Sequence, residues 1–319
     1  MGMSRHAAVR AASLSLLGAC VATVAVSARA DATDAKRPMS SRAQVGAAMA
    51  QLVAGLRGHT RGIAEGAAGT IEHAVASYVP LKFHPVDEGT LPAARKGGSC
   101  PPAMANVDGR FCIDKWEGSL LERGADGKTT ARASSGPLLK DGDYVARSAP
   151  GVLPQGYISA AQASKACANA GKRLCQNVEW RFACGGSKGT AHPYGAKKEP
   201  GKCHDSGRAP MMALHGPVPG HKFVGWGMAE LNDPKLITLD DTLAKTGAFP
   251  ECVNDYGVYD MEGNLHEWTA DANGTFQGGY WLDTTQHGEG CAYRTIAHGY
   301  NYHDYSTGFR CCADLAAAP

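Results

Sequence analysis

The segment Gly257-Val258-Tyr259-Asp260-Met261-Glu262-Gly263-Asn264-Leu265-His266-Glu267-Trp268 is the most informative part of this 319-residue chain. The Gly263-Asn264 pair in its middle favours a tight turn, because both residue types tolerate a left-handed backbone. Asp260 and Glu267 lie on either side of this pair, seven positions apart. The segment therefore predicts a tight turn that is flanked by two acidic side chains and followed by a tryptophan.

The overall composition indicates a globular, loop-rich protein. The formal net charge is +2 without a run of like charges, so nothing in it suggests nucleic acid or a membrane surface as a partner. The chain has 40 Gly and 17 Pro residues, which favour turns and irregular segments over long regular elements. Its length allows one large domain and an extension.

The N-terminus has the pattern of an export signal. Basic residues precede an apolar stretch from Ala11 to Val26, and Ala28-Arg29-Ala30 fits the small-x-small cleavage pattern. We therefore expect residues 1–30 to be a signal peptide and the mature chain to begin at Asp31. Such a protein would be exported to the periplasm or the extracellular space.

A second interpretation of the same region is lipoprotein processing. Leu17-Gly18-Ala19-Cys20 also resembles a lipobox, and lipidation at Cys20 would place the protein on a membrane. The apolar run continues past Cys20, which favours simple secretion. A retained transmembrane anchor is not expected, because the run is shorter than a full span.

Residues 31–98 form an Ala/Gly-rich N-terminal extension without Cys or Trp. Apolar residues recur at helical spacing between residues 45 and 75, but glycines interrupt them and weaken a helix. The segment is either a weak amphipathic helix or hairpin on the domain, or a partner-binding arm. Gly97-Gly98 marks the start of a domain that we expect over residues 99–316.

Several local signals place regular structure within this domain. Two extended segments, Cys100–Pro102 and Phe111–Glu117, flank the turn dipeptide Asp108-Gly109. A helix is expected over residues 159–171 with Ser159 as its N-cap. A second helix is expected over residues 177–184, with Asn177 as its cap and Gly185-Gly186 at its end. Beyond residue 190 the chain reads mostly as loops with short strands.

Ten cysteines follow the expected signal peptide, and an even number in an exported chain indicates five disulfides. No Cys-x2-Cys pair occurs, so a zinc site is not expected. The ten are Cys100, Cys112, Cys167, Cys175, Cys184, Cys203, Cys252, Cys291, Cys311 and Cys312.

The order of several fragments resembles the formylglycine-generating enzyme family, whose domains are also called sulfatase-modifying factor domains. The resemblance extends from about Phe111 to Asp314. It implies an α+β domain related to the C-type-lectin fold, loop-rich and braced by disulfides. The fragments are the opening segment, Ala170-Gly171-Lys172-Arg173-Leu174, Asn177-Val178-Glu179-Trp180, Pro193-Tyr194-Gly195, Gly278-Gly279-Tyr280-Trp281 and Gly308-Phe309-Arg310-Cys311-Cys312.

The resemblance also implies part of the disulfide pattern. It pairs Cys167 with Cys311 and Cys184 with Cys291, whereas Cys100 and Cys112 flank a hairpin and plausibly pair locally. The simplest completion is Cys203 with Cys252 and Cys175 with Cys312, although sequence alone does not determine connectivity. Adjacent residues on a strand point to opposite faces, so two different partners for Cys311 and Cys312 are physically natural.

The family places ligands of a structural Ca²⁺ at positions that correspond to Asp260, Gly263, Leu265 and Glu267. Ca²⁺ requires six to eight oxygen ligands. The two acids would supply carboxylates, and Gly263 and Leu265 would supply backbone carbonyls. The alternative is a turn whose acids face water.

The catalytic thiols of the family are missing. Its oxidase converts a cysteine of sulfatases to formylglycine with two thiols that bind Cu(I), a soft ion suited to sulfur. The interval from Tyr280 to Gly290, where these thiols belong, contains no Cys, and Cys291 matches the structural cysteine of the family. We therefore do not expect copper.

Three C-terminal histidines form a weaker candidate metal site. His287, His298 and His303 lie in one segment, and imidazoles bind Cu, Zn or Fe. Histidines in a polar, Gly-rich loop are more often surface or hydrogen-bonded residues.

The leading hypothesis is an exported family member that lacks the oxidase thiols. It would act as an accessory or binding domain for an unidentified protein or peptide, or perform a reaction that the sequence does not specify. One alternative is an O2-dependent oxidase of a protein cysteine with a rearranged metal site. The other is a lectin-like module that binds carbohydrate or peptide.

Overall fold

The structure is a computed structural model that describes residues 86–136, 138–140, 142–216, 226–296 and 298–316. The chain divides into two compact units, residues 1–82 and 83–319. The expected signal peptide, the lipobox and the helical spacing between residues 45 and 75 lie outside the described residues. No helix in the described ranges is long and apolar enough to cross a membrane.

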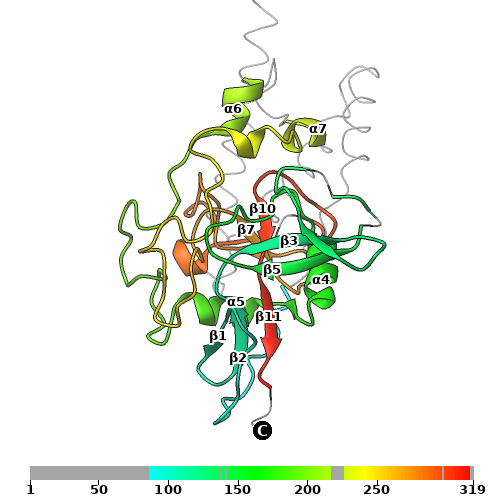
Figure 1. Cartoon of the computed structure of the whole chain (residues 1–319). Coiled ribbons are helices and arrows are strands. Elements are labelled where there is room, and N and C mark those ends of the chain that lie inside the picture. The colour runs from blue at the N-terminus through cyan, green and yellow to red at the C-terminus, as the bar shows by residue number, and fades with distance from the viewer. Residues whose placement is uncertain (1–85, 137, 141, 217–225, 297, 317–319) are drawn as a thin grey trace, which may run out of the picture. The chain divides into compact units, whose positions relative to one another are not determined.

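A four-stranded antiparallel sheet contains the expected hairpin (Figure 1). The Arg110 amide donates to the Val107 carbonyl and closes the turn, whose central residues Asp108 and Gly109 both have positive φ, as in a type I′ turn. The first strand lies at Met104–Val107 and not at Cys100–Pro102, where the sequence predicted it. The second strand ends at Asp114 and not at Glu117, because the chain turns there to enter a second sheet. In spatial order the strands are β1 (Met104–Val107), β2 (Phe111–Asp114), β11 (Cys311–Asp314) and β6 (Arg173–Leu174).

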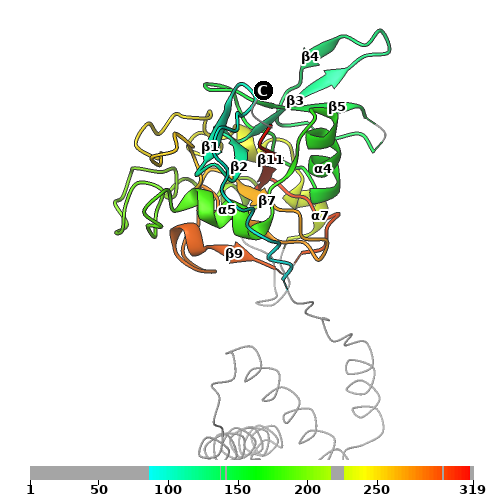
Figure 2. The same cartoon turned by 90° about the horizontal axis from the view of Figure 1, so that it is seen from below.

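Two further sheets complete the strand framework. In one, β10 (Thr307–Phe309), β7 (His266–Trp268), β8 (Phe276–Gln277) and β9 (Arg294–Thr295) lie in that order. β10 and β7 are parallel, and the other pairs are antiparallel. The other sheet has the order β4 (Thr129–Ala131), β3 (Gly118–Arg123), β5 (Tyr144–Ser148), and its β3–β4 ribbon projects from the rest of this unit in Figure 2.

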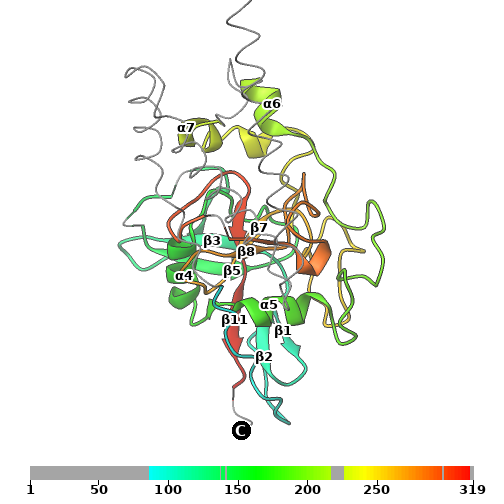
Figure 3. The ribbon, with the colours of Figure 1, turned by 180° about the vertical axis from the view of Figure 1, so that it is seen from behind.

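Two of the helices confirm the sequence prediction. α4 (Ala160–Asn169) begins at Ser159, whose side chain accepts from the Gln162 amide while the Gln162 side chain accepts from the Ser159 amide. α5 has the expected bounds, Asn177–Cys184, and packs against β1 and β2 (Figure 3). The remaining helices of the described residues are short: α6 (Pro210–His215), α7 (Met228–Leu231), η3 (Leu236–Thr238) and η4 (Gly290–Ala292).

The sequence predicted Asn177 as the N-cap of α5, and this prediction is wrong. Gln176 occupies that position, and its backbone amide donates to Glu179. The Asn177 side chain is used elsewhere: it donates to the Asp87 carbonyl and accepts from the Thr269 hydroxyl. A fully buried polar side chain needs such partners, and tertiary contacts therefore override its capping preference.

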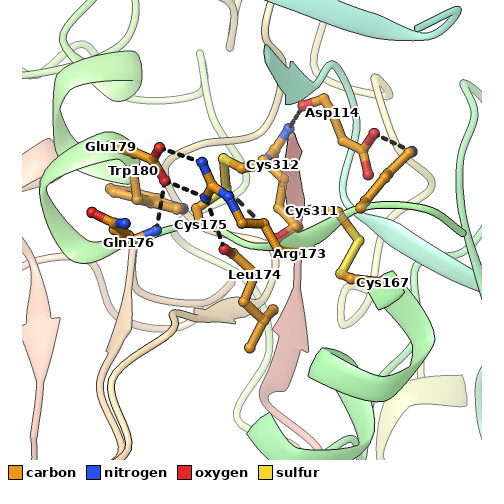
Figure 4. The surroundings of a disulfide bond; sticks show 12 residues. Asp114, Cys167, Arg173, Leu174, Cys175, Gln176, Glu179, Trp180, Cys311 and Cys312 are labelled. Carbon is orange, nitrogen blue, oxygen red and sulfur yellow. Dashed lines mark hydrogen bonds and ion pairs between the residues drawn. A yellow bond between two sulfur atoms is a disulfide. The ribbon is translucent and has the colours of Figure 1, made fainter. Parts of the chain in front are cut away.

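Five disulfides brace this unit: Cys100–Cys112, Cys167–Cys311, Cys175–Cys312, Cys184–Cys291 and Cys203–Cys252. These are the five pairs expected from the sequence. Cys311 and Cys312 point to opposite sides of β11, toward α4 and toward the start of α5 (Figure 4). Closing long loops restricts the unfolded chain, by about 3–5 kcal/mol for one bond. The disulfides help to explain how a chain with short strands and long loops holds one arrangement.

Residues 86–98 belong to the second unit, although the sequence predicted them to be part of the extension. The carboxylate of Glu88 pairs with Arg181 and Arg294, at 2.7 and 2.6 Å. The Arg95 amide donates to the Gly109 carbonyl. Ion pairs and backbone hydrogen bonds therefore hold this segment to the domain despite its few apolar residues.

Candidate functional site

The opening segment forms the tight turn that its Gly-Asn pair predicts. Asp260, Gly263 and Asn264 all have positive φ, so the backbone reverses sharply within a few residues. A Cβ atom at Gly263 would overlap the carbonyl oxygen of His204, so only glycine fits there without a shift. The turn therefore brings Asp260 and Glu267, seven positions apart, into one buried region.

A third carboxylate joins this region, and the sequence analysis missed it. Glu117 lies between β2 and β3 and is fully buried. Its side chain accepts from the Leu265 amide at 3.1 Å and from the side-chain amide of Asn264. Glu117 therefore holds the turn itself. The available signal was an acidic residue directly between two strand segments that are mainly apolar.

Arg310 is the cation of this centre. It is the single residue between β10 and β11, so it sits where two sheets meet, and it is fully buried. Its Nε and Nη2 atoms donate to the two carboxylate oxygens of Glu267 at 2.9 and 2.8 Å. The indole of Trp180 donates to the same carboxylate at 2.7 Å. Two charge-assisted hydrogen bonds from Arg310 and one from the Trp180 indole thus orient the Glu267 carboxylate.

The centre carries more acid than base. Burial, with the neighbouring Asp260 and Glu267, raises the pKa of Glu117 well above its usual value. Burial likewise raises the pKa of Asp260 to about 6, although the Gly247 amide donates to it. Three carboxylates face one guanidinium, so the fully ionised centre has two uncompensated negative charges. That excess favours either protonation or a bound cation.

The donor chemistry of this centre fits Ca²⁺. Carboxylates and the backbone carbonyls of a curled loop are hard oxygen ligands. A carboxylate oxygen has two lone pairs, so Glu267 can keep Arg310 and still coordinate an ion. Counting side chains alone, no group of three or more His, Cys, Asp or Glu in the described ranges is placed to hold a metal. A site here therefore depends on the carbonyls of Gly263 and Leu265.

The interval where the family carries its oxidase thiols is organised by a carboxylate. Asp283 accepts from the amides of Thr285 and Gln286 and from the Tyr293 hydroxyl at 2.9 Å. Cys291 follows in η4 and is bonded to Cys184. Each of the ten cysteines in the described residues belongs to a disulfide. This part of the chain therefore offers no thiolate.

His266 occupies an aromatic pocket near this interval. Its ring lies 4.4 Å from the Phe276 ring, 4.9 Å from that of Tyr280 and 5.5 Å from that of Tyr293. Within the described part of the chain, its Nδ1 atom is buried without a hydrogen-bond partner. Burial lowers the pKa of His266 to about 3, so the imidazole is neutral at physiological pH. The sequence analysis did not single out this residue.

The three histidines proposed as a second metal site do not form one group. The His298 ring stacks on Tyr302 at 3.9 Å, and the His287 ring meets Tyr293 edge-on. The Nδ1 atom of His303 faces the Asn301 carbonyl. Each ring thus has its own neighbour, and the described residues bring no three such side chains together as metal ligands.

Comparison with known proteins places this architecture among sulfatase-modifying factor domains. The family profile described as "Sulfatase-modifying factor enzyme 1-like domain" matches residues 125–315. A protein of Bos taurus named "Inactive C-alpha-formylglycine-generating enzyme 2" is 30% identical over 181 residues, 52% of each chain. Its namesake from Mus musculus is 30% identical over 184 residues, 52% of this chain and 51% of the relative. The chain spans about half the length of these curated relatives.

Solved structures give weaker similarity. "Major Tropism Determinant U1 Variant" is 17% identical, with a TM-score of 0.38 over 72% of this chain and 62% of its own. "Crystal Structure of CarF" is 16% identical, with a TM-score of 0.27 over 72% of this chain and 78% of its own. The predicted α+β, loop-rich, disulfide-braced class is confirmed by the elements themselves and agrees with the family match.

Proposed function

The chain belongs to the family of sulfatase-modifying factor enzyme 1-like domains, and we propose that it acts as a binding or accessory domain without copper-dependent formylglycine formation. One observation carries this proposal. The interval from Tyr280 to Gly290 contains no cysteine, and the next thiol along the chain, Cys291, is in a disulfide.

The chemistry of Cu(I) explains why this observation matters. Cu(I) binds soft thiolate ligands, and the oxidase of the family uses two of them. A disulfide sulfur has no thiolate charge, so Cys184 and Cys291 provide neither ligand while they are bonded. The two curated relatives are named inactive, which is a statement about those proteins and agrees with the proposal for this one.

We further propose that Ca²⁺ stabilises the scaffold at the buried acidic centre. Asp260 and Glu267 would supply carboxylate oxygens, and Gly263 and Leu265 would supply carbonyl oxygens. Glu117, which accepts from the Leu265 amide, would hold the turn in place around the ion. The ion would offset the excess negative charge that burial makes costly.

Export is the setting that the cysteines favour. Five disulfides persist in oxidising compartments, and they are rare in a reducing cytosol. Cleavage after residue 30 would release the protein to the periplasm or beyond, and lipidation at Cys20 would retain it at a membrane.

Oxygen consumption tests the proposed function. The purified chain is mixed with Cu(I) and a peptide that contains one cysteine, and both dissolved O2 and peptide mass are followed. We expect no O2 uptake above that of the same cysteine peptide and Cu(I) without the protein, and no conversion of cysteine to formylglycine. Conversion by the wild-type chain would establish the oxidase with a rearranged metal site and refute the proposal.

A further inference from the structure

A groove of about 440 Å³ lies beside the first turns of α4. Three segments that are distant in the sequence meet there: residues 138–140, residues 157–165 and residues 301–303. The volume is in the range of small-molecule sites and too small for a folded partner. The groove lies outside the acidic centre and outside the interval that lacks thiols.

The helix contributes one face to this groove. Lys165 follows Ala161 by four positions and Gln162 by three, so it lies on the same side of α4 as each of them. The Ser159–Gln162 capping box fixes the direction in which the helix starts. Because the helix end is already capped, the groove does not depend on free amides at that end.

The groove is basic. Lys140, Lys165 and His303 line it, and no acidic side chain among the described residues does. Neither lysine forms an ion pair with any residue in the described ranges, whereas Lys172 and Lys198 pair with Asp114 and Asp205 at 2.5 and 2.7 Å. Two unneutralised ammonium groups around one hollow create a positive potential there.

Two acidic residues of the described ranges that lie close in sequence to the groove, Asp304 and Asp143, have other partners. Asp304, next to His303, is buried and accepts from the Tyr302 hydroxyl at 2.6 Å and from Ser306. Asp143 accepts from Arg123 and Asn169. The described part of the chain thus leaves the positive charge of the groove for a ligand.

The rest of the lining is apolar or amide-bearing. Leu138 and Tyr157 supply hydrocarbon surface, and the Tyr157 hydroxyl is already engaged with the Asp233 carbonyl. Gln162 and Asn301 supply side-chain amides. The Gln162 oxygen accepts from Ser159, so Gln162 can offer its NH2 group as a donor to a hydroxyl, whereas the Asn301 amide can both donate and accept. A bare inorganic anion would leave this apolar and amide surface unused.

We propose that this groove binds a small organic carboxylate that also carries hydroxyl groups, of the uronic-acid class. Lys140 and Lys165 bind the carboxylate, and Gln162 and Asn301 bind the hydroxyls. The hydrocarbon side of the ligand packs on Leu138 and Tyr157. This inference rests on the proposed binding role and gives that role a ligand class.

Isothermal titration calorimetry with glucuronate and with glucose tests the assignment on the full chain. We expect glucuronate to bind at least tenfold more tightly than glucose, and its affinity to fall as salt rises. In the double variant K140Q/K165Q we expect this preference to disappear while the melting temperature stays unchanged. The control variant K128Q removes a lysine that pairs with Asp126 on an exposed loop, and it should bind as the wild type does.

Two results would overturn the inference: equal affinity of the wild type for glucuronate and glucose, or a K140Q/K165Q variant that keeps the preference. Inorganic sulfate that displaces glucuronate at equal concentration would also overturn it, because the organic part of the ligand would then contribute nothing. The oxygen assay is read separately on the same preparation. A groove without selectivity and no O2 uptake leaves the non-oxidase role standing, whereas selective binding with O2 uptake refutes that role and keeps the groove.

Discussion

Replacement of Arg310 by methionine tests the electrostatic account of the buried centre. The Arg310 guanidinium donates to both carboxylate oxygens of Glu267 and to the carbonyls of Asp114 and Tyr259. Methionine keeps a flexible apolar chain but removes the charge and all donors. Glu267 would remain buried without its cation, and loss of one partner of a buried pair costs about 3–5 kcal/mol.

The pH dependence of this loss has a definite sign. Burial raises the pKa of Asp260 to about 6 and raises the pKa of Glu117. An acid whose pKa is raised in the folded state stabilises that state at low pH. This contribution to stability is lost as pH rises through the pKa that the acid has in the folded state. Without Arg310 these pKa values rise further, so R310M should lose more stability at pH 7.5 than at pH 5.

Urea unfolding at both pH values, with chelator present, measures the effect. The matched control is R123M, because Arg123 forms a half-exposed pair with Asp143 that is worth at most about 1 kcal/mol. We expect a loss of about 3–5 kcal/mol for R310M at pH 7.5 and a smaller loss at pH 5. A loss no larger than that of R123M, or one independent of pH, would show that the centre is not held by this charge balance.

Three further predictions concern the same region. Ca²⁺ should raise the melting temperature more at pH 7.5 than at pH 5, because protons compete for Asp260 around its pKa of about 6. Asp260→Asn should lose most of this rise in differential scanning fluorimetry, and a wild-type melting temperature indifferent to Ca²⁺ would argue against the ion. Burial lowers the pKa of His266 to about 3 in the folded state. The neutral ring therefore contributes its full stability above the pKa that His266 has in the unfolded chain, and this contribution is lost as pH falls toward 3. That loss is about 2 kcal/mol at pH 5, so His266→Phe should flatten the stability–pH curve between pH 6.5 and 4, and an unchanged curve contradicts the burial argument. Gly263→Ala should cost about 1–3 kcal/mol beyond Gly189→Ala in urea unfolding, because both have positive φ but only Gly263 faces the carbonyl of His204; equal costs would refute the close approach.

Local signals in the sequence predicted local structure well. The Asp108-Gly109 turn, the Ser159 cap of α4 and the bounds of α5 all appear in the structure. These features depend on the backbone preferences of a few neighbouring residues, so the residue types at those positions are enough to predict them. Asn177 departs from this pattern because its partners are Asp87 and Thr269, which lie far away along the chain.

Features that depend on distant segments were the ones missed. Glu117 contacts the turn at Leu265, which lies far from it along the chain, and no residue close to Glu117 in the sequence predicts that contact. The pocket of His266 is built by aromatic rings from separate strands and loops. The groove beside α4 requires three segments to converge. A sequence gives the chemistry of such residues, but only the fold gives their neighbours.

The proposed role depends on the absence of a thiol pair that could bind copper in this scaffold. Mass-spectrometric disulfide mapping of the unreduced, purified chain tests it most directly at Cys291. We predict a peptide that links Cys291 to Cys184, together with the other four pairs and no free thiol among these ten cysteines. A free Cys291 that is protected from alkylation by Cu(I) would contradict the claim.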